Sequence, residues 1–433
     1  MENKMSSIKK ATILSNFVFE KLDIICFENF FYQYKNDIWE KMHDEEFAML
    51  VNREAKKVDE IGAVSLSLFR EVKQQLNNLT WEFYGDKIKN LNNNNNEICL
   101  NSNILHIKDN DFSFTDYQKE SFKFNKLPYN YNDKIKIEDL VHFKKFIIEI
   151  MDYDSNNIKQ EDKKDLNELI NFILEWIGYT LIRGNFLQKS LICVGEGGNG
   201  KGVLMEIWKK LVGLNNVASF DLSLVNKPEF AITAKDKLVH FSSDLKDSEQ
   251  LDTTAVKRAT IGEEVEGKKL YSQPFTFNYT AKIIILTNEL PYIHNMSNSV
   301  KRRFYLLPFN RVFTDEERDV NLIKKLESEI EGIFYLCITA LKRLIKRGHF
   351  IVPEKVQRLS NLYFSESDIV EQFLSEKNLN DTVNKRSAIY SDFKDYCVEI
   401  GKKPYGRNKF LEKMRRKGFT EFVSSGIFYL KKT

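Results

Sequence analysis

The sequence contains no apolar run close to the ~20 residues that a helix needs to cross a bilayer. Its basic start is followed by an apolar stretch that Glu20, Lys21 and Asp23 interrupt, so we expect no secretory signal and no membrane contact. The five cysteines are scattered and form no C-x-x-C pair, which argues against a zinc site and against a disulfide framework. These features predict a reducing, cytoplasmic compartment.

Net charge is also small. The 65 basic and 62 acidic residues leave a formal charge of +3, so no global basic field indicates nucleic-acid binding. The charge is uneven, however, because residues 401–433 hold ten Lys and Arg against two Glu. The N-terminal 165 residues contain no compact acidic cluster suited to two-metal nucleotidyl transfer, so no primase site is expected.

The most informative stretch is a glycine-rich segment between two apolar patterns. The run Leu191–Val194 predicts a buried strand, and apolar residues at helical spacing over 203–212 predict an amphipathic helix that ends at Gly213. The loop and the start of this helix consist of Gly195, Glu196, Gly197, Gly198, Asn199, Gly200, Lys201, Gly202 and Val203.

This loop has the composition of a phosphate cradle. A plain chain reversal needs one or two glycines, whereas four let successive backbone N–H groups approach a polyphosphate. The helix N-terminus adds positive charge, and Lys201 supplies a cation for the β- and γ-phosphates. Gly202 stands where a hydroxyl usually binds Mg²⁺, so carboxylate, water and phosphate must hold that ion. We expect a nucleoside triphosphate and Mg²⁺ as cofactors.

Two polar residues follow apolar runs that predict neighbouring strands. Asp244 ends the run 238–241 and is expected at the carboxyl edge of the sheet, where it would bind Mg²⁺ and orient the attacking water. Asn288 ends the run 282–286 and could sense the γ-phosphate. The alternatives are a solvated aspartate that ends a strand and a turn-forming asparagine.

The basic triplet Lys301-Arg302-Arg303 precedes another predicted strand. Such a triplet is usually a solvated face. Arg302 or Arg303 could instead be an arginine finger offered to the γ-phosphate of a neighbouring subunit, which requires a ring with head-to-tail contacts.

Residues 262–275 form a glycine-bounded insert with Lys268, Lys269 and Tyr271 at its expected tip. In a ring this loop could enter the central channel, with the lysines on the phosphate backbone and the tyrosine stacking on a base. Three glutamates precede these residues, so a surface loop of mixed charge remains the alternative.

The C-terminal 60 residues have the pattern of a winged helix. Helices are expected at about 385–399 and 407–417, and two β-prone runs joined by Ser-Ser-Gly follow them. Arg407, Lys409, Arg415 and Arg416 are the candidate DNA-binding residues of this unit, and protein docking is the alternative role.

Together these motifs resemble superfamily 3 helicases of the AAA+ class, in the branch found C-terminal in phage and plasmid primases and similar to the poxvirus primase-helicase. The segments that carry the resemblance are GEGGNGKGVL (195–204), LVHFSSDL (238–245), the stretch 255–291 and KRRFYLLPF (301–309). Gly202 resembles a known variant of this branch, and Asp244 stands where glutamate is common.

The resemblance implies an α/β fold in four parts. We expect an α+β N-terminal collar-like domain (1–160), an AAA+ P-loop ATPase domain (161–314), a helical segment on the ATPase (315–375) and a winged-helix domain (376–433). Its parallel sheet would include strands at 238–245, 275–288 and 302–309. Before it, we expect a helix at about 45–79, hairpins after the Asn92–Asn96 run, and helices at 133–149 and 163–183.

The resemblance also implies a hexameric ring around one DNA strand that moves 3′ to 5′ with ATP. It would act in the replication of a phage, plasmid or genomic island in the cytoplasm of a bacterial host, on single-stranded and forked DNA, with a separate primase or a host replication protein as a partner. The basic tail supports an alternative, an ATP-dependent initiator that binds an origin or loads another helicase without processive unwinding.

Overall fold

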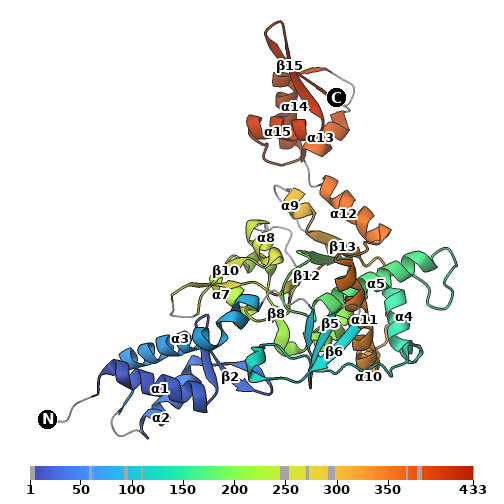
Figure 1. Ribbon diagram of the computed structural model, residues 1–433. Coiled ribbons are helices and arrows are strands. Elements are labelled where there is room, and N and C mark those ends of the chain that lie inside the picture. The colour runs from blue at the N-terminus through green and yellow to red at the C-terminus, as the bar shows by residue number, and fades with distance from the viewer. Residues whose placement is uncertain are drawn as a thin grey trace.

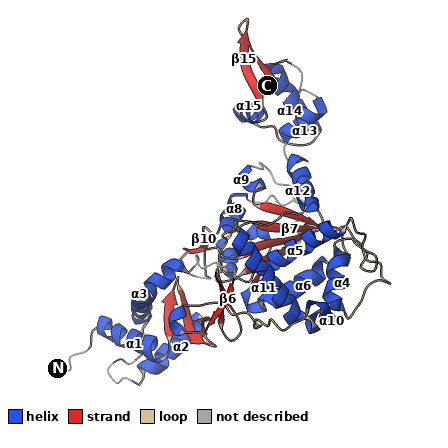
Figure 2. Cartoon of the chain, turned by 45° about the vertical axis from the view of Figure 1, so that its right-hand side comes forward, coloured by secondary structure: helices blue, strands red, loops and turns tan. Residues whose placement is uncertain are grey.

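The computed structural model describes residues 5–57, 61, 63–91, 96–108, 111–243, 253–269, 273–290, 298–366, 369–377 and 383–432. Three parts follow one another along the molecule (Figure 1): an N-terminal part around α1–α3, a central α/β core, and a C-terminal unit that stands apart at the far end. The same separation of the C-terminal unit is visible after a 45° turn (Figure 2).

The N-terminal part packs helices against a small antiparallel sheet of order β1-β2-β3. Its elements are α1 (Ser7–Lys21), β1 (Ile24–Phe27), β2 (Phe30–Lys35), β3 (Ile38–Met42), α2 (Asp44–Ala55) and α3 (Leu66–Asn90). Ser6 and Ser65 cap α1 and α3 by accepting hydrogen bonds from backbone N–H groups of the first turn. The helical periodicity at 45–79 falls on two helices, α2 and α3, between which the chain breaks.

A second antiparallel sheet, of order β4-β5-β6, lies against the core. Its strands are β4 (Glu97–Cys99), β5 (Ile104–Lys108) and β6 (Asp111–Thr115), which confirms the expected hairpins. Buried Leu105 and Ile107 belong to the same hydrophobic cluster as the main helices. This sheet therefore anchors the end of the N-terminal segment to the core.

The central sheet has five parallel strands in the order β13-β7-β12-β9-β8. The strands are β7 (Ser190–Val194), β8 (Val217–Ser219), β9 (Val239–Ser243), β12 (Lys282–Thr287) and β13 (Phe304–Pro308). The strand expected at 275–288 is two strands. Its first half, β11 (Phe275–Asn278), leaves the sheet and pairs antiparallel with β10 (Glu264–Gly267).

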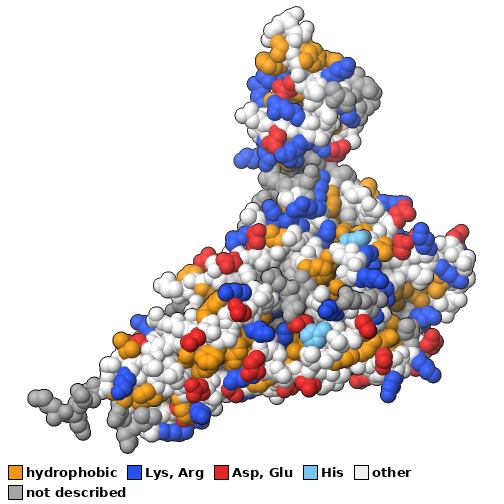
Figure 3. All heavy atoms as spheres, in the orientation of Figure 1, with side chains coloured by type: hydrophobic (Ala, Val, Ile, Leu, Met, Phe, Trp, Pro, Cys, Tyr) orange, Lys and Arg blue, Asp and Glu red, His pale blue; other side chains and the backbone are white. Residues whose placement is uncertain are grey.

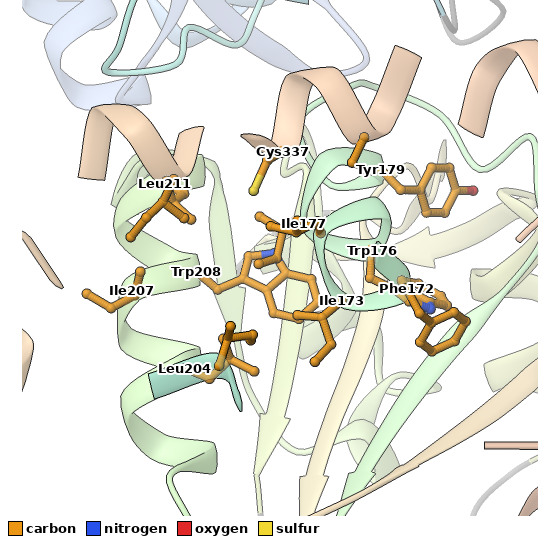
Figure 4. Close-up of a cluster of buried hydrophobic side chains, with 14 of the residues drawn as sticks. Phe172, Ile173, Trp176, Ile177, Tyr179, Leu204, Ile207, Trp208, Leu211 and Cys337 are labelled. Atoms are coloured by element: carbon orange, nitrogen blue, oxygen red, sulfur yellow. The ribbon is translucent and has the colours of Figure 1, made fainter. Parts of the chain in front are cut away.

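Helices cover both faces of the central sheet, as the nearly continuous burial along its strands requires. On one face lie α5 (Lys163–Tyr179), α6 (Lys201–Val212) and α11 (Ile330–Arg347), whose apolar side chains meet in the cluster of Figure 4. Gly178 allows the close approach of α5 to α11, because a Cβ there would lie 2.5 Å from the Cys337 carbonyl oxygen. On the other face lie α8 (Thr253–Ile261) and α12 (Glu354–Glu366).

Short elements complete the core. They are the 3-10 turns Lys119–Ser121, Ile137–Asp139, Leu214–Asn216, Leu222–Leu224 and Ile232–Ala234, and the helices α4 (Val141–Ile150), α7 (Pro228–Ala231), α9 (Asn298–Lys301) and α10 (Leu322–Ser328). The helix expected at 133–149 thus begins only at Val141.

The C-terminal unit has its own hydrophobic cluster. It contains α13 (Ile369–Lys377), β14 (Asn384–Lys385), α14 (Arg386–Glu399), α15 (Arg407–Arg416), β15 (Phe419–Ser424) and β16 (Ile427–Lys432). Ser425 and Gly426 turn the last hairpin with φ values of 51° and 75°. Buried Phe373 of α13 packs in this cluster, so α13 goes with the C-terminal unit although the expected boundary lies at 376. Among the described helices, none combines the length and apolar character needed to cross a membrane.

Candidate functional site

The glycine-rich loop and Asn288 lie side by side at the carboxyl edge of the central sheet. β7 and β12 are paired in parallel with Val194 opposite Thr287, so Gly195 and Asn288 are the next residues on adjacent strands. The Gly195 N–H donates to the Thr287 carbonyl oxygen at 3.3 Å, and the Asn288 side chain is exposed. Ligands of open α/β sheets bind at this edge.

Two of the loop glycines have backbone conformations that would be strained in any other residue. Gly198 and Gly200 have φ values of 76° and 83°. A Cβ at Gly195 would lie 2.1 Å from the Phe309 carbonyl oxygen, so that position is closed by the neighbouring backbone. By contrast, a Cβ at Gly197 or Gly202 would have no heavy atom within 4 Å. The loop is therefore packed tightly on one side and open on the other.

Lys201, at the start of α6, is folded into the loop. Its side chain is buried, with 8% of the residue exposed. The Nζ atom donates to the carbonyl oxygens of Gly195 at 2.5 Å and Glu196 at 3.0 Å, and to Oδ1 of Asn199 at 3.1 Å. The Lys201 ammonium thus binds two backbone carbonyl oxygens and one side-chain oxygen of the loop, acceptors whose place phosphate oxygens could take.

The segment after β13 crosses the same loop, a feature that the sequence analysis missed. The Asn199 side-chain amide donates to the Phe309 carbonyl oxygen at 3.1 Å, and the Phe313 N–H donates to the Gly198 carbonyl oxygen at 3.0 Å. An Nη2 atom of Arg318 lies 3.0 Å from the Cβ position of Gly198. The signal was available: basic residues follow a strand that was expected to end at this edge.

Arg318 forms only a modest surface ion pair nearby. Its Nη1 lies 2.6 Å from Oδ1 of Asp315, and the two side chains are 55% and 91% exposed. Such an exposed pair contributes about 0–1 kcal/mol. Little energy therefore opposes a move of Arg318 toward an anion on the loop.

The candidate metal ligand Asp244 lies outside the described residues. β9 ends at Ser243, which is opposite Leu286 of β12. β12 lies between β9 and β7, the strand that leads into the glycine-rich loop. Ser242 has a structural role, because its hydroxyl accepts a hydrogen bond from the Leu222 N–H at 2.9 Å. Within the described part of the chain, no group of three His, Cys, Asp or Glu side chains could hold a metal ion.

The two arginines of the basic triplet differ sharply in their surroundings. Arg302 is exposed and, with Lys189 and Lys301, lines a cavity of about 580 Å³. Arg303 is buried, and its Nη1 donates to the Ser299 carbonyl oxygen. Burial lowers the pKa of Arg303, and the positive charge of Arg302 adds to this effect. The Lys189 Nζ donates to the Arg302 carbonyl oxygen and fixes the main chain there.

The triplet and the glycine-rich loop lie at opposite edges of the sheet. Phe304 of β13 is opposite Ser190, and Pro308 is opposite Val194, so Arg302 precedes the strands whereas the loop follows them. At about 3.3 Å per residue, this separates Arg302 from the loop of its own chain by roughly 20 Å.

The insert that carries Lys268 and Lys269 is a hairpin, formed by β10 and β11. Lys269 contacts the N-terminal part: its Nζ lies 2.8 Å from Oδ1 of Asp44 and donates to the Asn29 carbonyl oxygen at 2.8 Å. The backbone N–H of Lys268 donates to the Pro228 carbonyl oxygen at 3.1 Å. Tyr271 lies outside the described residues.

The four basic candidates of the C-terminal unit fall into two pairs. Arg407 and Lys409 lie exposed in the first turn of α15. Arg415 instead donates to Glu421 at 2.5 Å, and Arg416 donates to Glu412 at 2.5 Å. On the face shown in Figure 3, basic side chains gather at the lower end of this unit and on the adjoining end of the core.

Comparisons with known proteins agree with the motifs. A family model described as "Family of unknown function (DUF5906)" matches residues 193–303. Two proteins that bear the name "Putative helicase" match larger parts. One, from Acanthamoeba polyphaga mimivirus, is 24% identical over 47% of this chain, and one from Frog virus 3 (isolate Goorha) is 21% identical over 52%. The chain is a distant relative of these viral proteins.

The resemblance to superfamily 3 helicases is therefore confirmed at the level of distant homology. The matches cover only 24% and 26% of the two viral proteins, so this chain corresponds to about a quarter of their length. Among solved structures, the apo C-terminal region of NrS-1 is 13% identical with a TM-score of 0.46, over 98% of this chain and 100% of that one.

Proposed function

We propose that this protein is an ATP-dependent DNA helicase of the superfamily 3, AAA+ type. The observation that carries the proposal is the loop Gly195–Lys201, which surrounds a buried lysine at the carboxyl edge of a parallel sheet. The distant relatives named as helicases support the choice of reaction.

ATP would bind with its phosphates on the loop N–H groups and at the N-terminus of α6. Lys201 would exchange its carbonyl partners for phosphate oxygens, which are charged and therefore stronger acceptors. The open side of the loop, at Gly197 and Gly202, has room for the nucleotide. When bound, Mg²⁺ neutralises phosphate charge. Asp244 would hold it, because Gly202 offers no hydroxyl.

Asn288 and Arg318 would complete the site from within the same chain. Asn288 follows the strand beside the loop and would sense the γ-phosphate, with its amide donating to the phosphate and accepting from the water that Asp244 orients. Arg318 is close enough to Gly198 to reach a phosphate on the loop with a change of side-chain rotamer.

Arg302 would serve the site of a neighbouring subunit. Its position at the opposite edge of the sheet excludes its own loop and supports a head-to-tail ring, which we propose to be a hexamer. An arginine that neutralises the transition state in this way contributes on the order of 10³–10⁵ in rate. Arg303 is buried and would hold the main chain of this region.

The DNA strand would pass the hairpin tip with Lys268, Lys269 and Tyr271, moving 3′ to 5′. The C-terminal unit would act as a winged helix through Arg407, Lys409, Arg415 and Arg416, since its helix, helix and hairpin follow in that order. The N-terminal part would be the collar, and the protein would replicate a mobile element with a separate primase.

Purified protein should hydrolyse ATP, be stimulated by single-stranded DNA, and unwind a 3′-tailed fork but not a 5′-tailed fork. In Lys201→Ala, both activities should fall by roughly 100-fold or more, as for loss of a group that stabilises the transition state. Lys227→Ala removes an exposed lysine near α7 and should leave them unchanged. Unwinding that survives Lys201→Ala would refute the assignment. Sequence-specific footprints without strand separation would favour the initiator.

A further inference from the structure

A large cleft separates the N-terminal sheet from the core, at the opposite edge of the central sheet from the glycine-rich loop. Its volume is about 1150 Å³, above the ~300–1,000 Å³ of small-molecule sites. One wall is β3 and the segment 124–129, and the other is the chain after α6 together with residues 232–237. Both walls carry lysines.

Beside this cleft, three lysines from distant parts of the chain surround the buried ring of Phe30. The Nζ atoms of Lys41, Lys269 and Lys235 lie 3.6, 4.0 and 5.3 Å from the centre of the Phe30 ring. Lys41 is on β3, Lys235 is in the core and Lys269 is in the β10–β11 hairpin. The cleft and the hairpin therefore share one cluster of lysines, in which Lys235 pairs with Glu28 and Asp236, and Lys269 pairs with Asp44.

Two of the three carboxylates that line the cleft pair with cations, whereas Glu40 accepts a hydrogen bond from the Asn36 side-chain amide. Asp236 accepts from Arg183 at 3.1 Å, Lys235 at 3.0 Å and the Tyr32 hydroxyl at 2.6 Å. Burial by itself raises the pKa of Asp236, but Lys235 and Arg183 hold it well below its usual range, so this group stays an anion. Glu327 likewise pairs with Lys210.

Two lysines remain without such a partner. Among the described residues, neither Lys41 nor Lys237 forms an ion pair, and Lys237 donates only to the Asn215 carbonyl oxygen. Partial burial lowers the pKa of both side chains, that of Lys41 to about 8. Asp236 opposes this shift, while Lys235 and Lys269 add to it at Lys41. An anion between the two walls would relieve both the repulsion and the lost hydration.

We propose that this cleft binds the phosphodiester backbone of a single DNA strand, with Lys41 and Lys237 as its phosphate contacts. The proposal rests on DNA being the substrate, as in the proposed function. Cations on two walls suit a chain of phosphates better than one phosphate group. Half-buried Phe124 and Tyr129 line the cleft and can stack on bases. Lys269 of the hairpin and Lys41 of the cleft lie on the same Phe30 ring, so a strand that leaves the hairpin can pass from one lysine to the other.

Fluorescence anisotropy of a labelled oligothymidylate, without ATP and at several salt concentrations, tests the proposal. The double variant Lys41→Gln/Lys237→Gln should bind at least about tenfold more weakly, and its salt slope should fall by about 1.4, that is, 0.7 for each lost phosphate contact. Lys41→Arg/Lys237→Arg should retain affinity. The control Lys87→Gln/Lys164→Gln removes two exposed lysines and should match wild type.

ATP hydrolysis without DNA should be unchanged in the cleft variant, which separates this result from failure of the proposed function. Unchanged DNA affinity and salt slope would overturn the proposal. So would lost binding of a fluorescent ATP analogue or of inorganic phosphate with DNA binding intact, since the cleft would then be a small-anion site.

Ultraviolet cross-linking of wild-type protein to a bromodeoxyuridine oligonucleotide provides a test without any variant. Cross-linked peptides should include residues 124–129 or 38–43. Cross-links found only in other peptides would contradict the cleft as a strand site.

Discussion

Arg302 and Lys201 lie at opposite edges of one sheet, Arg302 before β13 and Lys201 after the adjacent strand β7. Arg302 precedes Phe304, which is opposite Ser190, whereas Lys201 follows a loop that begins after Val194. The two residues of one chain therefore cannot meet at one phosphate, and two subunits are needed to bring this pair together.

Arg302→Ala should abolish ATP hydrolysis and leave ATP binding intact. Mixing it with Lys201→Ala subunits should recover part of the activity, because some interfaces then combine an intact loop with an intact Arg302. Arg303→Ala should instead lower the Tm, because its buried guanidinium bonds the Ser299 carbonyl oxygen. Activity that depends only on the share of wild-type subunits would exclude a finger in trans.

Arg318→Ala should weaken ATP binding and slow hydrolysis, on the order of tenfold for each, if its guanidinium contacts a phosphate. Mixing with Lys201→Ala should not rescue it, because both changes damage the loop site of their own subunit. Arg358→Ala is the matched control, since Arg358 is exposed and pairs with Glu354 in the same chain segment. Equal effects of the two substitutions would remove Arg318 from the site.

Gly202→Ser should lower the Mg²⁺ concentration for half-maximal ATPase activity several-fold. The position is helical and has no heavy atom within 4 Å of a Cβ, so a hydroxyl fits where the ion is expected. Gly202→Ala fills the same space without a ligand atom and should raise the Tm slightly, because alanine favours a helix over glycine by about 0.5–1 kcal/mol. An identical Mg²⁺ dependence in both variants would place the ion elsewhere.

Asp44→Asn should raise the affinity for single-stranded DNA a few-fold. In this structure Asp44 holds Lys269 at 2.8 Å, so DNA phosphates compete with a carboxylate for the hairpin lysine. Asp86→Asn, which removes an exposed partner of Lys89, is the control for the change in net charge. Titration of a labelled oligonucleotide measures both. Weaker binding in Asp44→Asn would mean that the contact positions Lys269 for DNA.

The sequence predicted the parts of the core whose secondary structure follows from the hydrophobic pattern of a single segment. The apolar run before Gly195 and the helical spacing after Lys201 each extend over several residues, and both elements form as expected. The final two helices and hairpin were predictable for the same reason. β8, with only three residues at the sheet edge, is too short to leave such a pattern.

Pairing between distant segments was not predictable in this way. The run 275–288 looks continuous, but residues 275–278 find their partner in β10 and residues 282–287 find theirs in β7 and β9. The contacts of Arg318 with the loop and of Lys269 with Asp44 join residues more than 100 positions apart. The hydrophobic periodicity of a single segment does not indicate contacts of this kind.

The five-residue strand β13 connects Arg302 with the segment that contacts the glycine-rich loop. Arg302 precedes β13, and Phe309, which binds Asn199, follows it. β13 is an edge strand of the sheet, but it pairs with β7 along its whole length, and an extended, packed strand hardly shortens or stretches. We therefore expect a displacement of Phe309 on nucleotide binding to move Arg302 by a similar distance, so that β13 would couple one ATP site to the next.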